Sequence, residues 1–405
     1  MRDKHRVEGI VGQEVGWGEG LREGVRQSVR EFLQDVLEEE LEAALGAPRY
    51  GRGEARAGYR NGGKGRRLVT SAGGVRLAVP RARLFEPRGG TREWESRVLP
   101  RYERRTPDVD AAVLGCYLGG VNTRKVKAAL RPLLGGAGLS RSAVSRIVSK
   151  MRSRFEAWAA RSLAEETFAY VFLDGLGVKV RLGHRVVSVP VLAALGVRPD
   201  GQKVLLALEL AGAESTASWE GLLRSLEARG MKAPVLAVVD GNPGLEAALR
   251  LVWPKTKIQR CTVHKLRNLL AKAPKHLHDE VLEDYHAFVY ADAPAAVRAG
   301  HAAFLRKWER KCPGVAASLR EAGDLLLTFT EFPVDQWKCL RTTNCVERLN
   351  EEFRRRVKTQ CSLPSEDAVV VLLYALVAEG FVRMRKIDGF EKIGEVLMAT
   401  RREAA

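Results

Sequence analysis

The sequence predicts an α/β fold, in which a mixed sheet with helices on its faces follows a basic region of helices and a hairpin. Between residues 166 and 260, early strand patterns are followed by alternating helix and strand patterns, an order typical of a mixed sheet. Residues 49–165 combine short strand signals with helical periodicity. At 405 residues, of which 45% are hydrophobic and 29% charged, the chain is long enough for two or three domains.

The charge of the chain indicates its class of partner. The net charge is +18 at pH 7 and the isoelectric point is about 9.9. Residues 51–105 hold 15 Lys and Arg against 5 Asp and Glu, so the charge is clustered. A generally basic, solvated surface is the alternative, but clustering favours a polyanionic partner such as nucleic acid.

Cysteine usage and hydropathy predict the compartment. Six cysteines are scattered without a paired framework, which suits a reducing interior. The amino terminus lacks the apolar core of a signal peptide. The longest apolar run, residues 368–378, is shorter than the roughly 20 residues of a membrane span. We therefore expect a cytoplasmic protein with no membrane partner.

Residues 1–48 form the first predicted segment, and it is helical. Residues 22–46 show one apolar face and one acidic face, the pattern of an amphipathic helix. Its apolar residues are Val25, Val29, Phe32, Leu33, Val36, Leu37 and Leu41. Such a helix is expected to pack on its own domain or on a second subunit.

Residues 49–105 form a predicted basic, DNA-binding hairpin region. Strand patterns at 67–71 and 75–79 are joined by Ala-Gly-Gly, which indicates a β-hairpin. Arginine side chains suit phosphate groups. The residues expected to contact DNA here are Arg60, Asn61, Arg81 and Arg83. A flexible basic loop is the alternative.

Residues 106–165 are predicted to be helical and DNA-binding. Helical patterns cover residues 111–118, 123–134 and 142–158. A glycine-containing turn joins the last two, and Ser140 is a candidate N-cap. In a helix-turn-helix the second helix enters the major groove, where it would present Arg141, Ser142, Ser145, Arg146 and Lys150. A two-helix corner that touches no DNA is the alternative.

Residues 166–260 form the predicted α/β core. Strand patterns lie at 168–173, 178–182, 186–195, 203–210, 235–239 and 257–259, with helical patterns at 218–229 and 244–252. Two strands end in Asp-Gly, at Asp174 and Asp240. Buried strands of α/β folds present catalytic or metal-binding carboxylates at their carboxyl ends. Alternatively both acids only begin turns, but the repetition favours a shared site.

Residues 261–335 are expected to be a mostly helical insertion. Cys261 and His264 stand at Cys-x-x-His spacing, and a basic helix with Lys265 and Arg267 follows, which we expect to contact DNA. A structural zinc site needs four ligands, and no second pair stands at suitable spacing. We therefore expect Cys261 and His264 to pack and hydrogen-bond near the acids.

Residues 336–405 supply a third acid. The pattern predicts a helix that begins at Asn344 and bears Glu347. In the alternative interpretation, Asn344 and Glu347 form a capping box and nothing more. Three carboxylates suit two-metal phosphoryl transfer, because hard divalent cations prefer oxygen ligands. Asp174, Asp240 and Glu347 are thus the predicted catalytic residues and ligands of two Mg²⁺ ions, with Mn²⁺ as a substitute.

Several stretches are similar to the motifs of one family. They are GYRNG (58–62), LAVPRAR (77–83), SRSAVSRI (140–147), FLDG (172–175), ESTASWEGLLRSLEARGM (214–231), VVDG (238–241), QRCTVHKLRN (259–268) and TTNCVERLNEEFRRR (342–356). In these stretches, and over most of its length, the chain resembles the transposases of the mutator family found in bacterial insertion sequences.

The resemblance implies a ribonuclease-H-like core whose Asp-Asp-Glu triad is interrupted by a helical insertion. By motif, the triad falls on Asp174, Asp240 and Glu347. The resemblance also implies an amino-terminal region that binds the terminal inverted repeats of the element. It assigns Cys261, His264 and Trp219 to support of the active site.

The expected function is therefore that of a DNA transposase, which cleaves the element ends and transfers the freed strand to target DNA. Because synapsis joins two ends, a homodimer or higher oligomer on DNA is expected. Two alternatives remain: a DNA-binding regulator that uses the core only as a scaffold, and a ribonuclease-H-like nuclease without strand transfer.

Overall fold

The computed structural model describes residues 17–51, 56–121, 123–134, 139–182, 185–359 and 367–404. The chain divides into two compact units, Met1–Ser149 and Lys150–Ala405. The division falls within helix α4 (Arg141–Ala159), whereas the sequence suggests a boundary at residue 165.

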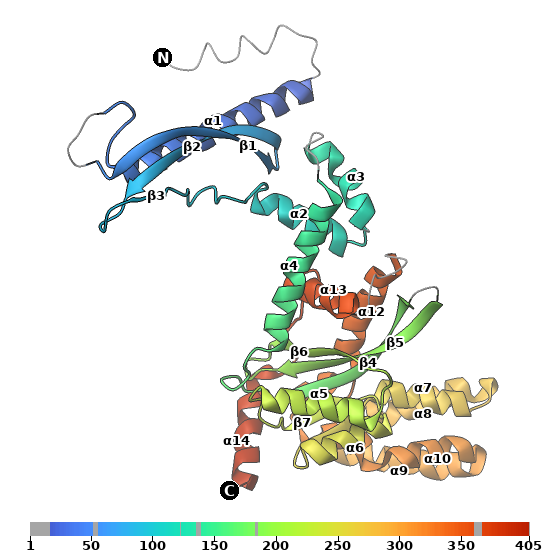
Figure 1. The fold of residues 1–405 in the computed structure, drawn as a ribbon. Coiled ribbons are helices and arrows are strands. Elements are labelled where there is room, and N and C mark those ends of the chain that lie inside the picture. The colour runs from blue at the N-terminus through green and yellow to red at the C-terminus, as the bar shows by residue number, and fades with distance from the viewer. Residues whose placement is uncertain are drawn as a thin grey trace. The chain divides into compact units, whose positions relative to one another are not determined.

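In the first unit, helix α1 (Trp17–Leu45) packs against an antiparallel sheet (Figure 1). Its strands, in sheet order, are β1 (Gly58–Thr70), β2 (Gly73–Phe85) and β3 (Thr91–Glu93). The carboxyl-terminal half of α1 buries Leu37, Leu41 and Leu45 against the sheet. Farther toward its start, Leu21, Val25 and Phe32 remain exposed. The first unit thus covers the predicted apolar face of α1 in its carboxyl-terminal half only.

Strands β1 and β2 are longer than predicted, and they overturn the flexible-loop alternative from Gly58 onward. The pairing runs from Gly58–Leu84 to Thr70–Gly73, with one irregularity between Arg60 and Gly63. Glycine has no side chain to alternate between the two faces, so the two-residue period is hidden in this glycine-rich stretch.

The remaining helices of the first unit agree with the predicted helical patterns. They are α2 (Pro107–Leu118), α3 (Thr123–Leu134) and the beginning of α4. Helix α2 packs on α3. Ser140 caps α4 as predicted, because its Oγ accepts a hydrogen bond from the Ala143 N–H at 3.1 Å. The predicted turn at residues 135–138 lies outside the described residues, as does the side chain of Arg141.

In the second unit, the described strands form one mixed sheet in the order β6-β5-β4-β7-β8. Their bounds are β4 (Tyr170–Leu182), β5 (Arg185–Val197), β6 (Lys203–Leu210), β7 (Leu236–Val239) and β8 (Lys257–Arg260). Pairing is antiparallel from β4 to β6 and parallel from β4 to β8. The predicted mixed sheet is confirmed.

One strand differs from the prediction. The patterns at 168–173 and 178–182 belong to the single strand β4, so Asp174 lies inside a strand and not at its tip. The physical reason is pairing with β5, which continues from Tyr170 through Asp174 to Leu182. The parallel ladder with β7, in contrast, ends at Phe172. Asp174 is therefore just beyond the parallel part of the sheet.

Helices cover both faces of this sheet (Figure 1). Their bounds are α5 (Thr216–Ala228), α6 (Pro243–Val252), α7 (Thr262–Lys272), α8 (His278–Val289), α9 (Pro294–Lys311), α10 (Pro313–Ala322), α11 (Val334–Leu340), α12 (Asn344–Thr359), α13 (Asp367–Ala378) and α14 (Ile393–Ala404), with 3₁₀ turns at Lys275–Leu277, Gly323–Leu326, Thr328–Glu331 and Phe390–Lys392. Helices α5 and α6 bury the main core with one face. On the other side, α12 contacts β4 and α13 contacts β6.

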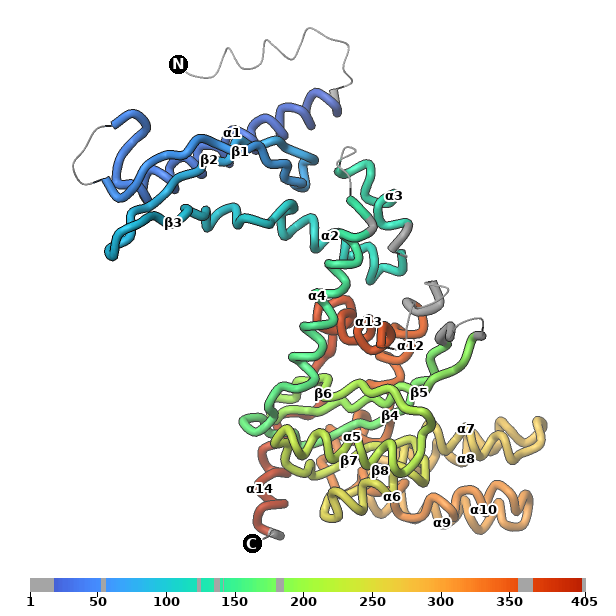
Figure 2. The backbone as a smooth tube through the Cα atoms, in the orientation of Figure 1, coloured from blue at the N-terminus to red at the C-terminus, as the bar shows by residue number. Residues whose placement is uncertain are grey.

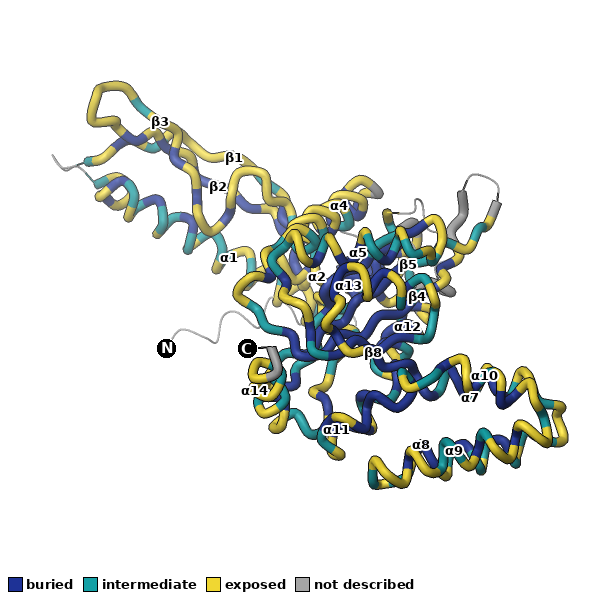
Figure 3. Tube along the Cα trace, turned by 90° about the horizontal axis from the view of Figure 1, so that it is seen from below, coloured by how far each residue is buried: buried dark blue, intermediate teal, exposed yellow. Residues whose placement is uncertain are grey.

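The chain between β8 and α11 is mostly helical. Helices α7 to α10 contact one another as the pairs α7–α8, α8–α9, α9–α10 and α7–α10, and they extend beside the sheet (Figure 2). In Figure 3 exposed residues recur along these four helices, whereas much of the sheet is buried. The start of α7 lies at the end of the sheet, because it directly follows β8, and α10 reaches β8 through the ion pair between Glu321 and Arg260.

Candidate active site

The first two acids come together through the register of two strands. Strand β4 pairs with β7 so that Phe172 is opposite Val238. Asp174 comes two residues after Phe172, and Asp240 two residues after Val238. The same register therefore brings the two acids to neighbouring positions at the end of the parallel ladder. This common edge is the location that α/β folds use for ligands.

Asp174 has a buried carboxylate that is partly satisfied by protein groups. Only 6% of the residue is exposed. Its Oδ2 accepts a hydrogen bond from Asn350 Nδ2 at 2.7 Å, and its Oδ1 accepts one from the Gly175 N–H at 3.1 Å. Burial raises the pKa of Asp174 to about 7; the charge of Asp240 adds to this rise, as does that of Glu347, while His264 opposes it. Negative charge is therefore costly at this position.

Asp240 is also part of the turn that follows β7. Its Oδ1 accepts a hydrogen bond from the Asn242 N–H at 2.9 Å. The Asn242 side chain in turn accepts hydrogen bonds from the first N–H groups of α6, at Gly244 and Leu245. Gly241 between them has a φ of 95°, a conformation that favours glycine. The turn interpretation of Asp240 is therefore correct, and it does not conflict with a role in the site.

Glu347 lies in the first turn of α12, and its contacts oppose the capping-box alternative. The N–H of Glu347 bonds to the carbonyl of Thr343, so the helix is entered from Thr343 and not from Asn344. The Glu347 Oε1 atom is instead 3.1 Å from the guanidinium of Arg267 and 3.3 Å from His264 Nε2. The carboxylate is directed toward α7, away from its own helix start.

Cys261 and His264 hold α7 to the chain that precedes α12. Cys261 is fully buried, and its Sγ accepts a hydrogen bond from the Thr343 N–H at 3.3 Å. His264 Nδ1 lies 3.4 Å from Thr343 Oγ1. Burial alone would raise the pKa of the Cys261 thiol, but hydrogen bonds with His264 and Thr343 outweigh it and lower this pKa. The bond with Cys261 is the main cause of a raised pKa of His264.

The donor atoms suit a cation, although they are not arranged as a complete binding site. The oxygens of Asp174 and Asp240 are the ligands that hard divalent cations prefer. Among the described residues, however, no three His, Cys, Asp or Glu side chains form a group that could hold a metal ion. The Glu347 carboxylate is bonded to His264 and Arg267, so joint binding of an ion would require it to exchange these partners. The Cys261–His264 pair likewise has no further ligands for zinc within that part of the chain.

Two polar residues at the site were missed by sequence reasoning. Asn350, 3% exposed, holds the Asp174 carboxylate; it follows Glu347 by three positions, a spacing that places both on one side of a helix. Glu214 lies against the backbone of Gly175, where an added Cβ would be 2.4 Å from Glu214 Oε1. Burial, together with the charge of Asp240, raises the pKa of Glu214. Its only sequence signal was its position at the start of a family-like stretch.

Trp219 and Lys265 are both buried. Trp219, on α5, is 1% exposed and belongs to the main core, so any support that it lends the site acts through the position of α5. Lys265 is 2% exposed; its Nζ bonds to Glu321 Oε2 at 2.7 Å and to the Ser318 carbonyl at 2.9 Å. The prediction that Lys265 contacts DNA is contradicted by this burial. Arg267, in contrast, is exposed.

The predicted DNA contacts of the first unit are a mixed set. Arg60 is half-buried and bonds to Glu38 at 2.5 Å and Glu42 at 3.3 Å, so it fastens β1 to α1 and does not present a free charge. Arg81 bonds to Glu93 at 2.9 Å, and Arg83 donates to Thr91 Oγ1 at 3.2 Å. Six of the predicted residues are exposed: Asn61, Arg81, Arg83, Ser142, Ser145 and Arg146. Lys150, the first residue of the second unit, is also exposed.

Two other expectations concern thiols and hydropathy. The cysteines within the described residues, Cys116, Cys261, Cys312, Cys339 and Cys345, are free thiols. Across the same residues, every helix is too short or too polar to cross a membrane.

Comparison with known proteins identifies relatives over most of the chain. Residues 4–382 match the family described as "Transposase, Mutator family". The transposase for insertion sequence element ISRM5 of Rhizobium meliloti (strain 1021) is 38% identical over 336 residues, which cover 83% of this chain and 82% of that protein. The transposase for element IS6120 of Mycolicibacterium smegmatis is 38% identical over 277 residues, covering 67% and 84%.

A third relative and one solved structure complete the comparison. The transposase for element IS406 of Burkholderia multivorans (strain ATCC 17616 / 249) is 34% identical over 343 residues, covering 83% of this chain and 85% of that protein. The Drosophila P element transposase strand transfer complex matches with a TM-score of 0.28 and 11% identity, covering 71% and 83%. This structural likeness is too weak to support an argument.

Proposed function

Because the chain belongs to the Mutator family of transposases, we propose that it binds the terminal inverted repeats of an insertion sequence, cleaves DNA at their ends and joins the freed 3′ hydroxyl to target DNA. The second unit is proposed to be ribonuclease-H-like, on the support of a sheet that is antiparallel from β4 to β6 and parallel from β4 to β8. Helices α3 and α4 are proposed to be a helix-turn-helix, on the support of exposed Ser142, Ser145 and Arg146 on α4.

The register between β4 and β7 is the observation that carries the catalytic assignment. It makes Asp174 and Asp240 neighbours at one sheet edge, and α12, the helix that contacts β4 there, bears Glu347. Two acids at neighbouring positions, with a third on a helix that contacts the same strand, support phosphoryl transfer better than three unrelated turn and cap residues would.

We propose that Asp174, Asp240 and Glu347 hold two Mg²⁺ ions, or Mn²⁺ in their place. When bound, such ions activate the attacking oxygen and stabilise the leaving one. The chain's own residues prepare this site. Asn350 orients the Asp174 carboxylate through its hydrogen bond. His264 and Arg267 hold the Glu347 carboxylate beside α7, and it would exchange these partners for an ion.

Substitution of the acids tests the proposal. Asp174→Asn and Glu347→Gln keep the shape of each side chain but remove a charged ligand, so we expect cleavage and strand transfer of labelled element ends to be lost while DNA binding persists. Glu351→Gln is the matched control, because Glu351 is an exposed acid on the same helix. Calorimetric titration with Mn²⁺ should show weaker binding by the first two variants only.

The outcomes also separate the alternative functions. Normal strand transfer by Asp174→Asn or Glu347→Gln would refute the assignment. A wild-type protein that binds the ends and cuts nothing in the presence of Mg²⁺ would be a DNA-binding regulator. Cleavage without joined products on a target plasmid would indicate a nuclease without strand transfer.

We also propose a homodimer or higher oligomer on DNA, because joining two element ends requires two copies of the site. The exposed apolar residues of α1, Leu21, Val25 and Phe32, support this proposal. Light scattering of the protein with and without end DNA would test it. A cytoplasmic location is proposed because the DNA of a bacterial element lies there.

A further inference from the structure

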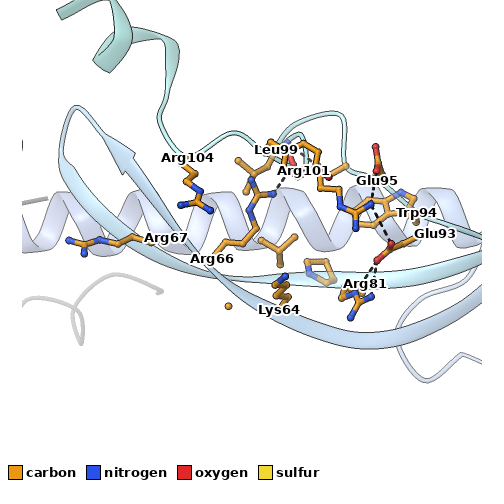
Figure 4. A pocket seen from close by; sticks show the side chains of 15 residues that line it. Lys64, Arg66, Arg67, Arg81, Glu93, Trp94, Glu95, Leu99, Arg101 and Arg104 are labelled. Carbon is orange, nitrogen blue, oxygen red and sulfur yellow. Dashed lines mark hydrogen bonds and ion pairs between the residues drawn. The ribbon is translucent and has the colours of Figure 1, made fainter. Parts of the chain in front are cut away.

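A cavity lies in the first unit between the β1–β2 hairpin and the chain that follows β3 (Figure 4). Its volume is about 510 Å³, within the range of about 300–1,000 Å³ that is usual for ligand sites. One wall comes from residues 64–67 and 79–81 of the hairpin, and the other from residues 93–104.

Both walls are held in place by interactions within the unit. The Arg66 guanidinium donates hydrogen bonds to the carbonyls of Leu99 at 3.3 Å and Pro100 at 2.9 Å, which connects the hairpin to the opposite wall. Glu40 of α1 binds Ser96 and the Arg97 N–H. Trp94 also packs on the buried face of α1. The cavity is therefore preformed, and a ligand pays little ordering cost on binding.

The lining carries an excess of positive charge. Six of its residues are cationic, Lys64, Arg66, Arg67, Arg81, Arg101 and Arg104, against two acidic ones, Glu93 and Glu95. The acids are already used, because Arg81 pairs with Glu93 and Arg101 pairs with both.

Within the described part of the chain, four of these cations form no ion pair, and one of them, Arg66, donates to backbone carbonyls instead. Among the described residues, Lys64, Arg67 and Arg104 are exposed and form no ion pair. Arg104 also acts on a further cation of the lining: burial, followed by the charge of Arg104, lowers the pKa of Arg66. Like charges held together in a preformed cavity oppose folding slightly, and an anionic ligand would remove that cost.

We propose that this cavity binds the phosphodiester backbone of duplex DNA through Lys64, Arg67 and Arg104. The inference rests on the proposed function, and it locates the DNA contact on residues that sequence reasoning did not select. The rim favours nucleic acid over a small anion, because Tyr102 is 85% exposed and the Arg101 guanidinium lies 5.8 Å from its ring centre. Tyrosine hydroxyls, like arginine and lysine side chains, donate hydrogen bonds to the phosphate oxygens of duplex DNA. Phosphate contacts carry no base information, so this site should act alike on all sequences.

The test measures how binding of a labelled duplex depends on salt. A triple variant, Lys64→Gln with Arg67→Gln and Arg104→Gln, is compared with the wild-type full chain by fluorescence anisotropy over a range of KCl concentrations. Each phosphate contact contributes about 0.9 to the slope of log affinity against log salt, so the slope should become shallower by about 2.7. The loss should be equal for a terminal-repeat duplex and for one of unrelated sequence.

A control variant separates this site from the effect of net charge. Arg22→Gln with Arg30→Gln and Arg88→Gln removes the same charge from exposed positions of the same unit outside the cavity. We expect it to retain nearly the wild-type slope. If both triple variants change the slope equally, the cavity proposal is overturned and the protein still binds DNA by general attraction.

The design also distinguishes failure of the proposal from failure of the proposed function. If the wild-type chain binds no duplex at low salt, both are wrong. The cavity proposal alone is wrong if the wild-type chain binds duplex DNA and the triple variant binds it equally well. In that case, heparin or inorganic phosphate that binds to the wild-type chain but not to the triple variant would identify the cavity as a site for another anion. Thermal melting checks folding. Because Lys64, Arg67 and Arg104 are exposed and form no ion pair within the described residues, their replacement should leave the melting temperature nearly unchanged.

Discussion

Removing the Glu321 carboxylate tests how helix α7 is held beside the acids. Glu321, on α10, bonds to the Arg260 guanidinium at 2.7 Å and to Lys265 Nζ at 2.7 Å. Both cations are buried, with 5% and 2% of each residue exposed. Because Lys265 belongs to α7, which also bears His264 and Arg267, this charge cluster helps to place the two groups that contact Glu347.

We expect Glu321→Gln to destabilise the protein by about 2 kcal/mol. Loss of one partner from a buried ion pair costs about 3–5 kcal/mol, because the other charge is left without compensation. The Glu321 side chain is itself 56% exposed, so water screens part of the interaction and lowers the figure. Arg260 keeps Glu246 at 3.3 Å, whereas Lys265 keeps only the Ser318 carbonyl at 2.9 Å among its described contacts. Most of the cost therefore arises at Lys265.

The assay is urea unfolding at several pH values. Hydrogen bonding by Arg260, and then by Lys265, lowers the pKa of Glu321 from 4.5 to about 2. Its carboxylate therefore stabilises the fold above about pH 4.5, and this contribution disappears as the pH falls toward 2. The difference between wild type and Glu321→Gln should narrow below about pH 5.

An exposed ion pair on the adjacent helices gives the control. Glu309 bonds to Arg320 at 2.8 Å with both side chains more than half exposed, so Glu309→Gln should cost under about 0.5 kcal/mol. The reasoning is refuted if Glu321→Gln costs no more than Glu309→Gln, or if its cost does not change with pH.

The remaining predictions concern Asp174 and its neighbours. Asn350→Ala removes a hydrogen bond to the Asp174 carboxylate, and a bond to a charged group is worth about 1.5–3 kcal/mol. The rate of cleavage should therefore fall roughly 10- to 100-fold, while the affinity for end DNA stays unchanged. An equal loss of DNA affinity would contradict a positioning role for Asn350. Gly175→Ala places a methyl group 2.4 Å from Glu214 Oε1 and should cost about 1–3 kcal/mol of stability. Adding Glu214→Ala should restore most of that stability in urea unfolding, whereas additive effects would contradict the contact.

Much of the sheet could be predicted from the sequence, because its signals are local. Apolar β-branched runs give the strands of the second unit, and repeated helical spacing gives α5 and α6. The lengths of strands β4 and β1 were both predicted too short, for one reason. The extent of β4 depends on its pairing with β5, and that of β1 on its pairing with β2. Neither partner can be read from the strand's own residues.

The acids of the site were predictable, but the state of their neighbours was not. In the sequence, Asp174 and Asp240 each follow an apolar strand pattern, and Glu347 lies near the start of a helical pattern, so each has a local signal. Lys265 shows why a basic residue on a helix is a poor guide to DNA contact. Its counterion, Glu321, comes 56 residues later in the chain, and only the packing of α7 on α10 brings the two together.

The alternation of side chains along β4 explains how Glu214 and Asn350 reach the site from opposite faces of the sheet. Successive residues of a strand face opposite sides of the sheet. Asp174 therefore faces α12, where Asn350 binds it, whereas Gly175 faces the side of α5, where Glu214 lies over its backbone. An acid followed by glycine is typical of a turn in sequence. In this strand, however, the acid contacts Asn350 on one face of the sheet, and the absence of a side chain at Gly175 leaves room for Glu214 on the other. The Glu214 carboxylate can approach β4 at this position only because residue 175 is glycine. The Asp174–Gly175 pair therefore determines which groups contact both faces of the strand at the site.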